Sequence, residues 1–565
     1  MMSPFFKERF PEGVSSEIDL TAYSSVLDVL DEACKRFADR PAFSNMGKCI
    51  TFAELDVLAR DFAAYLQNHL GLKPGERIAI QLPNTLQYPI ALFGALRAGL
   101  VVVNTNPLYT EREMRHQFQD SGAKALVVLA NMAHLAEKVL PDTGIEHVIV
   151  TELGDMHSFV KRTLINSVVR YVKKMVPDYS LPNAIPFRDV LAVGKALPLQ
   201  EHHAASEDLA VLQYTGGTTG VAKGAMLSHR NLVANMLQAR IILNTILDEG
   251  KESIVLPLPM YHIYTFTVSL VLMESGNHSL LVTNPRDLPA FVKELGKNEF
   301  TGFVGLNTLF VALANREDFK QLDFSKLKLT ISGGMALTHA AEEEWHAITG
   351  CHINEGYGMT ETSPIVTFNI PCKSQLGTIG LPVPSTDLKT VDEEGRDLEH
   401  GEVGELCVKG PQVMMGYWKN ESATKEMIDA DDWLHTGDMA VIQDDGFVRI
   451  VDRKKDMINV SGFNVYPNEV EDVIVSHTGI IEAAAIGVPD DKTGEAIKVF
   501  LVRRDENLTV KEVQEYCRSH LTGYKVPKQV EFRDELPKTN VGKVLRRTLR
   551  DEELENIKQK QAQVA

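Results

Sequence analysis

The chain has 565 residues, of which 44% are hydrophobic and 24% are charged, and its formal net charge is −18. This length predicts two to four domains, and the composition is that of an ordinary globular protein with ample apolar material for its cores. The acidic balance argues against a general nucleic-acid-binding protein, because contacts with phosphate require a basic surface.

Targeting and redox signals both favour the cytoplasm. The N-terminal stretch MMSPFFKERFPEG lacks the apolar core of a signal peptide. No apolar run reaches the roughly 18 residues that a membrane span requires. The six cysteines are spread along the chain without a CxxC pair, which favours buried or incidental thiols in a reducing compartment.

Residues 50–152 alternate strand and helix patterns in a regular order. RIAIQL predicts a short buried strand, YPIALFGALRAG has helical spacing, and VVVNTNP predicts the next strand. The alternation continues through REMRHQFQDSG, KALVVLA, AEKVL and HVIVTE, and it returns at about residues 250–365. Strand–helix–strand repetition predicts an α/β fold of doubly wound layers, in which crossover helices cover a parallel sheet.

Residues 157–177, HSFVKRTLINSVVRYVKKMVP, carry five Lys or Arg residues and no acidic residue. Helical spacing places an apolar set on one face, comprising Val160, Leu164, Val168, Tyr171 and Met175. Two interpretations remain open. One is a surface helix packed on the core, and the other is an interfacial helix at an anionic membrane.

The stretch YTGGTTGVAKGA, residues 214–225, has the composition of a phosphate-binding loop. It differs from the Walker pattern, because Lys223 is followed by glycine instead of serine or threonine. Its glycines allow several backbone N–H groups to turn toward one anion, and its threonines and Lys223 add hydroxyl donors and a positive charge. The alternative is a flexible turn without a ligand.

The stretch EGYGMTET, residues 355–362, places an aromatic ring beside a hydroxyl and a carboxylate. Tyr357 is suited to stacking on a base, and Glu361 to binding Mg²⁺, which usually takes one or two carboxylates together with phosphate oxygens. From about residue 376 to 450, short runs such as GELCVKG and GFVRIVD alternate with turns, which predicts a small antiparallel β unit.

Three further motifs lie toward the C-terminus. WLHTGD ends in Asp438, an acid suited to two sugar hydroxyls, and DRKKDMINVSGFNVYPNEVE contains Arg453 and Gly462. PKTNVGKVLRR presents Lys543 on a short loop that contains a glycine. The charged DRKKD cluster is either a solvated turn or a domain boundary, because few apolar residues cross it.

Together and in this order, these motifs resemble those of the adenylate-forming superfamily, which includes acyl-CoA synthetases, adenylation domains and firefly-luciferase-like enzymes. The resemblance extends through PLPMYHIY, TNPRDLP and LPVPST, and from about residue 20 to 555 the chain resembles the bacterial long-chain fatty-acid–CoA ligases. It implies activation of a long-chain fatty acid by ATP through an acyl-adenylate to acyl-CoA, with release of AMP and pyrophosphate. ATP and CoA are the implied co-substrates, and Mg²⁺ is the implied cofactor.

The resemblance also implies a role for each site residue. Lys543 bridges the acyl and α-phosphate oxygens, Thr360 contacts the α-phosphate, Glu361 binds Mg²⁺, and His262 lies near the acyl carboxylate. For His262 a hydrogen-bonded core histidine is the alternative. Tyr357 lies against adenine, Asp438 and Arg453 hold the ribose hydroxyls, and Gly462 lines the path of the CoA thiol. The remaining nucleotide contacts are Tyr214, Thr215, Gly216, Gly217, Thr218, Thr219, Gly220, Lys223, Gly333 and Gly334.

The implied organisation has two parts. Residues 1–451 form an N-terminal domain that binds the acyl group and ATP, with a small β-barrel unit at about 376–450. Residues 452–565 form a mobile α+β domain that carries Lys543 and rotates at a hinge matching Asp452. Peripheral contact with an anionic membrane is a further expectation, and a homodimer is one alternative for assembly.

Two other functions remain open. A fatty acyl-AMP ligase would load a carrier protein and yield no CoA thioester, whereas a non-catalytic lipid- or nucleotide-binding protein would release no pyrophosphate. The apolar stretches TFTVSLVLM and TGFVGLNTLF are candidates for a fatty-acyl tunnel that Gly302 and Gly305 would keep open. Two residues depart from the family pattern: Asp432 replaces a glycine, and Asn459 replaces an apolar residue whose burial would make an unpaired amide costly.

Overall fold

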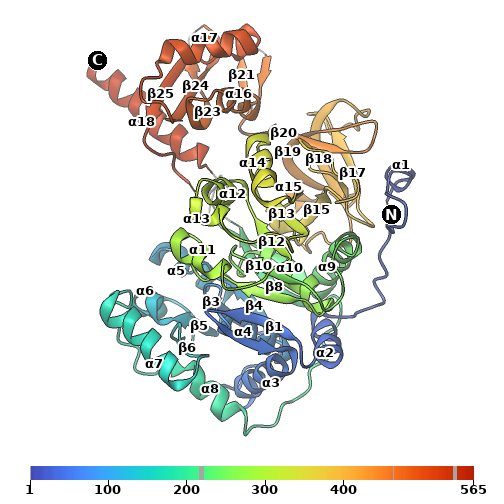
Figure 1. Ribbon diagram of the computed structural model, residues 1–565, viewed down its shortest axis with the longest axis vertical. Helices are drawn as coiled ribbons and strands as arrows, with labels where there is room; N and C mark the ends of the chain where they lie inside the picture. The colour runs from blue at the N-terminus through green and yellow to red at the C-terminus, as the bar shows by residue number, and fades with distance from the viewer. Residues whose placement is uncertain (1, 216–221, 462, 491, 539–543, 565) are drawn as a thin grey trace. The chain divides into compact units, whose positions relative to one another are not determined.

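The computed structural model describes residues 2–215, 222–461, 463–490, 492–538 and 544–564 (Figure 1). Its contacts form two compact units. The first comprises Met1–Asp387 and Lys409–Leu434, and the second comprises Leu388–Val408 and His435–Ala565. About half of the predicted β unit, residues 388–408 and 435–450, therefore groups with the C-terminal residues, whereas the functional boundary at Asp452 stays a prediction.

The first unit contains a mixed sheet of nine strands (Figure 1). The strands from β14 to β1 run parallel to their neighbours, and antiparallel strands lie at both edges. The order across the sheet is β16 (Leu381–Pro382), β15 (Ile365–Phe368), β14 (Ile353–Gly358), β13 (Leu329–Gly333), β12 (Gly302–Gly305), β10 (Ser253–Leu256), β11 (His278–Leu281), β1 (Pro41–Asn45) and β2 (Lys48–Thr51).

A second sheet in the same unit has seven strands. Six are parallel and the last pair is an antiparallel hairpin. The order is β7 (Ile185–Pro186), β6 (His147–Thr151), β5 (Ala125–Leu129), β3 (Arg77–Gln81), β4 (Val101–Asn104), β8 (Leu209–Thr215) and β9 (Lys223–Ser228). The central strands are buried almost throughout, as parallel strands covered by helices on both faces must be.

Helices follow most strands of the first unit, which confirms the predicted α/β alternation. Local signals set their ends: Thr110 and Glu113 form a capping box at the start of one helix, and Gly122 ends it at a φ of 62°. The α-helices are α1 (Pro4–Lys7), α2 (Val26–Arg36), α3 (Phe52–Asn68), α4 (Gln87–Arg97), α5 (Glu111–Ser121), α6 (Ala133–Val139), α7 (Phe159–Ser167), α8 (Phe187–Gly194), α9 (His229–Leu243), α10 (Ile263–Glu274), α11 (Leu288–Leu295), α12 (Asn307–Ala314), α13 (Glu317–Lys320), α14 (His339–Thr349) and α15 (Glu421–Met427). Shorter turns are η1 (Ala130–Met132), η2 (Leu140–Asp142), the π-helical η3 (Val168–Val172) and η4 (Thr360–Thr362).

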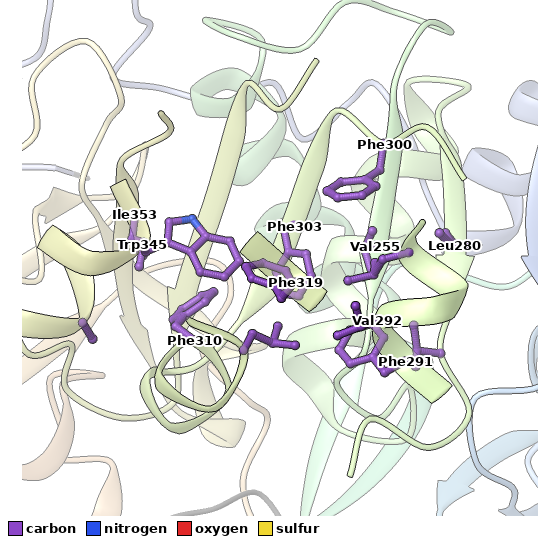
Figure 2. Packing of buried hydrophobic residues seen from close by; sticks show 14 of the residues in the cluster. Val255, Leu280, Phe291, Val292, Phe300, Phe303, Phe310, Phe319, Trp345 and Ile353 are labelled. Carbon is purple, nitrogen blue, oxygen red and sulfur yellow. The ribbon is translucent and has the colours of Figure 1, made fainter. Parts of the chain in front are cut away.

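An aromatic cluster fills the space beside the nine-stranded sheet (Figure 2). Phe303 and Phe310 pack on Trp345, with ring centroids 5.3 and 4.8 Å from its ring. A Cβ at Gly302 would lie 2.3 Å from Ile254 Cδ1, and one at Gly305 would lie 2.7 Å from the Phe310 ring. These glycines therefore make room for core side chains, and the expectation of a fatty-acyl tunnel stays a prediction.

The second unit begins with a four-stranded sheet in the order β17 (Asp387–Val391), β18 (Val403–Lys409), β19 (Leu434–Ile442) and β20 (Val448–Arg453). The small β unit is thus confirmed, but within the described residues it is an open sheet and not the expected barrel. The rest of this unit is an α+β fold. Its sheet has the order β22 (Phe463–Val465), β21 (Ile458–Val460), β24 (Gly494–Arg503) and β23 (Ile480–Asp490), with β25 (Gln529–Arg533) also paired to β24, and its helices are α16 (Pro467–Val475), α17 (Val510–His520), η5 (Gly523–Lys525) and α18 (Arg546–Val564).

None of the helices in the described ranges combines the length and the apolar character that crossing a membrane requires.

Candidate active site

The β8–β9 hairpin holds both ends of the predicted phosphate loop. Thr215 and Lys223 are register partners in this hairpin, so the two ends of the loop lie side by side. The predicted loop residues between them lie outside the described residues: Gly216, Gly217, Thr218, Thr219 and Gly220. Their contacts with phosphate stay a prediction.

Tyr214 lies on β8, where its side chain holds the hairpin to Asp120. Its side chain is buried, and its hydroxyl donates a hydrogen bond to Asp120 Oδ2 at 2.5 Å. Burial and the neighbouring Asp120 carboxylate raise the pKa of this phenol above its usual range. A Cβ at Gly224 would lie 3.1 Å from the Tyr214 ring, so the two strands approach closely here. These contacts give Tyr214 a structural role, while its predicted contact with the nucleotide stays a prediction.

Tyr417 joins the hairpin to the predicted Mg²⁺ ligand. Its hydroxyl donates to Glu361 Oε1 at 2.6 Å, and Lys223 Nζ lies 5.0 Å from the centre of its ring. Tyr417 also forms an isolated bridge with Ala225 on β9. The structure therefore brings Lys223 and Glu361 to the same tyrosine side chain, Lys223 to its ring and Glu361 to its hydroxyl.

Tyr417 is a site residue that sequence reasoning missed. It lies 56 residues from Glu361 in the sequence, in the stretch MGYWKN, and only the tertiary fold brings the two together. Burial and the Glu361 carboxylate raise the pKa of the Tyr417 hydroxyl above its usual range, so this group remains a proton donor to the carboxylate. Glu361 itself is 5% exposed.

The predicted adenine and α-phosphate contacts come from the ends of neighbouring parallel strands. Gly333 ends β13, Tyr357 lies near the end of β14, and Thr360 begins η4 directly after it. Gly334 follows with a φ of 85°, a backbone conformation that favours glycine. The carboxyl ends of parallel strands are where ligands bind in open α/β sheets, so this placement supports the predicted site.

His262 caps the helix α10. Its Nδ1 accepts a hydrogen bond from the backbone N–H of Tyr264 at 3.3 Å, and the backbone N–H of His262 donates to the Pro259 carbonyl at 3.0 Å. These bonds support the structural alternative for this histidine. Its predicted position near the acyl carboxylate stays a prediction.

Glu355 lies on β14, two residues before Tyr357. It is a second group to which the sequence analysis gave no role. It is 8% exposed, and one carboxyl oxygen accepts the backbone N–H of Leu337 at 3.1 Å. Burial raises the pKa of this carboxyl to about 8, and the bond from Leu337 opposes only part of that rise. The side chain therefore holds the Gly334–Leu337 turn against β14.

Glu355→Gln is expected to stabilise the protein increasingly as the pH rises. The folded-state pKa of about 8 lies above the ordinary value of 4.5, so the contribution of this group to stability is complete below pH 4.5 and is lost as the pH rises through 8. At about 1.4 kcal/mol per pKa unit, the gain at pH 8 is roughly 4 kcal/mol. Thermal unfolding midpoints of the variant and the wild type between pH 5 and 8 measure this gain. The exposed Glu343→Gln is the matched control, and a gain that does not change with pH would contradict the assignment.

Asp438 and Arg453 are brought together in the second unit. They are register partners across β19 and β20, and Arg453 Nε lies 3.5 Å from Asp438 Oδ1. Asp438 is mostly buried and Arg453 is about two-fifths exposed, at 14% and 39% of their side-chain surfaces. This pairing supports a joint role for the two side chains, and their predicted contact with ribose stays a prediction.

A buried charge cluster surrounds the predicted hinge. The Asp452 carboxylate accepts the backbone N–H groups of Arg453 and Asn468, both at 2.7 Å, and lies 3.9 Å from the Arg546 guanidinium. Arg546 also donates two hydrogen bonds to Glu471, at 2.9 and 2.6 Å. Burial raises the pKa of Asp452 to about 6, and Arg546 offsets part of that rise. The start of α18 is thus fastened to the hinge and to α16.

Two predicted C-terminal site residues, Lys543 and Gly462, lie outside the described residues. Of the two departures from the family pattern, Asn459 is exposed, so the concern about a buried side-chain amide does not apply; its backbone N–H donates to the Glu495 carboxylate at 2.7 Å. Asp432 has a φ of 63°, the left-handed conformation for which glycine is better suited.

Comparison with known proteins identifies the family. The AMP-binding enzyme family matches residues 30–418, and the AMP-binding enzyme C-terminal domain matches residues 469–543. The chain belongs to the AMP-binding enzyme family.

Within this family, the chain is 54% identical to the long-chain-fatty-acid–CoA ligase of Salmonella typhimurium over 98% of both chains. Among solved structures, it is similar to ATP-bound MatB from Rhodopseudomonas palustris, with a TM-score of 0.80, 28% identity and coverage of 94% of this chain and 99% of that one. It also shares its fold with the anthranilate CoA ligase AuaEII, with a TM-score of 0.84, 24% identity and coverage of 95% and 99%.

Proposed function

We propose that the chain is a long-chain fatty-acid–CoA ligase that works through an acyl-adenylate. The observation that carries this proposal is the 54% identity to a long-chain-fatty-acid–CoA ligase over 98% of both chains. The fatty carboxylate attacks the α-phosphorus of ATP and pyrophosphate leaves. The thiol of CoA then attacks the acyl carbon, AMP leaves, and the thiol proton is released.

The first step brings two anionic groups together, so its transition state needs preorganised positive charge and hydrogen-bond donors. In the proposal, Lys543 supplies a charge at the acyl and α-phosphate oxygens, Thr360 a hydroxyl at the α-phosphate, and Lys223 a charge at the departing phosphates. Tyr357 lies against adenine, and Asp438 and Arg453 bind the ribose. The hairpin that aligns Thr215 with Lys223 supports this division of roles.

Mg²⁺ is the proposed cofactor, and Glu361 would hold it. The chemistry of the site fits, because a buried carboxylate oriented by the Tyr417 hydroxyl is a ligand of the kind that Mg²⁺ takes together with substrate phosphates. The ion would neutralise charge on the phosphate oxygens. Tyr417 orients the carboxylate by donating to Oε1.

The proposal includes two orientations of the C-terminal domain about Asp452. In the first, Lys543 acts on the adenylation step, and in the second, the path lined by Gly462 admits the CoA thiol. The charge cluster of Asp452 and Arg546 supports a mechanical link between the hinge and the start of α18, three residues after Lys543.

One product analysis tests this function. The protein is incubated with ATP, Mg²⁺, CoA and fatty acids of graded length, and acyl-CoA, AMP and pyrophosphate are quantified. Equal amounts of the three products from long-chain acids are expected. Acyl-adenylate without thioester would identify a ligase that loads a carrier protein, and no pyrophosphate at all would identify a non-catalytic binding protein.

The proposed location is cytoplasmic, with peripheral contact at the inner face of the cytoplasmic membrane. The basic, acid-free composition of residues 157–177 supports contact with an anionic surface. A homodimer stays a prediction, and sedimentation equilibrium measures it directly.

A further inference from the structure

The helix α7 and the π-helical turn η3 that continues it expose more apolar side chains than an ordinary surface helix does. An ordinary surface helix packs its apolar stripe on the core and turns its polar face to water. Here no side chain from Phe159 to Val172 is fully buried. Of the apolar set predicted for one helical face, Val160, Leu164, Tyr171 and Met175 are exposed and Val168 is half-buried, which favours the second of the two open interpretations.

The outward apolar side chains form what we call the apolar stripe. Val160 is 76% exposed, Leu164 63% and Tyr171 72%, and Phe159, Val172 and Met175 add 71%, 73% and 49%. Isolated exposed apolar residues are common, but a group of this size within 17 residues is not, because contiguous apolar patches on a protein surface usually mark a contact. This stripe therefore needs a partner surface.

Polar side chains attach the segment to its own unit. Asn166 accepts the backbone N–H of Gly154 at 2.8 Å and donates to Glu152 at 2.8 Å. Lys161 donates to the Met46 carbonyl at 2.6 Å, and Arg170 pairs with Glu152 at 2.7 Å. The segment is thus held by hydrogen bonds and an ion pair, which leaves its apolar stripe available.

Basic residues accompany the stripe. Residues 157–177 contain five Lys or Arg residues and no acid, in a chain whose net charge is −18. Lys161 and Arg170 are engaged as described, whereas Lys173 and Lys174 are exposed beside Tyr171 and Val172. Arg162 lies over the Phe159 ring, 5.3 Å from its centre. Positive charge therefore lies next to the apolar side chains.

A hollow of about 270 Å³ beside the segment is lined by Glu152, Arg162, Thr163, Asn166, Ser167, Arg170 and Tyr171. This hollow is not suited to binding an anion. The Glu152 carboxylate forms part of its wall and already pairs with the Arg170 guanidinium. Attraction to an anionic partner must therefore come from the surface charge of the segment as a whole.

We infer that the α7–η3 segment docks the protein on an anionic lipid bilayer, with the apolar stripe in the interfacial region and Lys173 and Lys174 against the lipid phosphates. Apolar side chains next to lysines are what a helix lying in a membrane interface requires. A second copy of this chain is a poorer partner, since a symmetric contact would bring the same basic residues against each other. The inference rests on the proposed function in one respect: the enzyme would take its fatty-acid substrate from the membrane.

Two variants of the full-length protein test this inference. The first, Lys173→Gln/Lys174→Gln, removes charge while leaving the bonded Lys161 and Arg170 in place. The second, Val160→Ser/Leu164→Ser/Tyr171→Ser, removes the centre of the stripe. Matched controls change exposed residues on other elements: Lys326→Gln/Lys425→Gln for charge, and Val57→Ser/Val510→Ser for apolar surface.

Cosedimentation with vesicles of phosphatidylcholine alone, or mixed with phosphatidylglycerol or phosphatidylserine, is the measurement. The wild type is expected to bind both anionic mixtures equally, because the attraction comes from surface charge on the segment, and to lose binding as salt is raised. Each lysine near an anionic surface contributes about a factor of five in affinity, so the double Gln variant is expected to bind roughly 25-fold more weakly. The stripe variant is expected to lose binding as well, and both controls to bind like the wild type.

Equal binding of the wild type and the two test variants would overturn the inference. So would a change from dimer to monomer in the stripe variant, measured by sedimentation equilibrium, because the stripe would then be a contact between copies. Acyl-CoA synthesis from a long-chain acid dispersed in neutral detergent, without vesicles, is measured in parallel. Its retention in variants that no longer bind vesicles supports the inference, whereas its absence in the wild type would refute the proposed function without affecting the vesicle result.

Discussion

Lys543→Ala is expected to nearly abolish the formation of acyl-adenylate from fatty acid and ATP. The change leaves the approaching carboxylate and the α-phosphate without a compensating charge. Loss of one stabilising donor costs about 10²–10³ in rate, and loss of a full charge is expected to cost at least as much. Exchange of labelled pyrophosphate into ATP measures this half-reaction. Supplied with preformed acyl-adenylate and CoA, the same variant is expected to form thioester at close to the wild-type rate.

Gly462→Leu is expected to show the opposite pattern, with the second half-reaction lost and the first retained. Glycine has no side chain, so the pantetheine arm of CoA can pass close to its backbone. Leucine is expected to block that path, and adenylate should then form and accumulate without thioester. Failure of both variants in the same half-reaction would rule out a mechanism with two domain orientations in this chain.

Glu361→Gln is expected to lower pyrophosphate release by about 10²-fold or more, because the site loses the negative charge proposed to hold Mg²⁺ while the side chain keeps its size. The amide oxygen still accepts the hydrogen bond that Tyr417 donates at 2.6 Å, so packing around η4 is preserved. Activity measured against Mg²⁺ concentration should show a higher half-maximal concentration and incomplete recovery at saturation.

Tyr417→Phe is the matched control for this result. It removes the hydroxyl that orients Glu361 but leaves the carboxylate, so a loss of about tenfold to a hundredfold is expected, as for partners that orient metal ligands. Near-wild-type rates of Glu361→Gln at limiting Mg²⁺ would contradict the proposed role of the carboxylate. Equal losses in the two variants would show that orientation by Tyr417, and not charge, is what the site requires.

The main elements of the first unit could be read from local patterns. Buried β-branched runs such as RIAIQ became β3, helical spacing gave α4, and Thr110 with Gly122 marked the ends of α5. These signals are local because hydrophobic period, capping groups and left-handed glycine positions act within a few residues. The family resemblance likewise came from contiguous motifs, each of which carries its own chemistry.

Other predictions depended on neighbours far apart in the sequence, and some of these were wrong. The space beside Gly302 is occupied by Ile254, a residue on the adjacent strand β10, and the local apolar pattern did not show that contact. The β unit was expected to close into a barrel, but strand pairing is a property of the whole sheet, and the four strands form an open one. Asn459 was considered for burial from its place in a pattern, yet it is exposed on β21.

The sequence by itself determined the family, the reaction class, the α/β alternation and the identities of the candidate site residues, because these depend on residue types at short spacing. Only the tertiary structure decided which of these residues share an environment. It joined Lys223 to Glu361 through Tyr417, buried Glu355 so that its pKa rises, and turned the apolar face of α7 outward. Burial and contact depend on what the rest of the chain packs against a residue, and no local pattern contains that information.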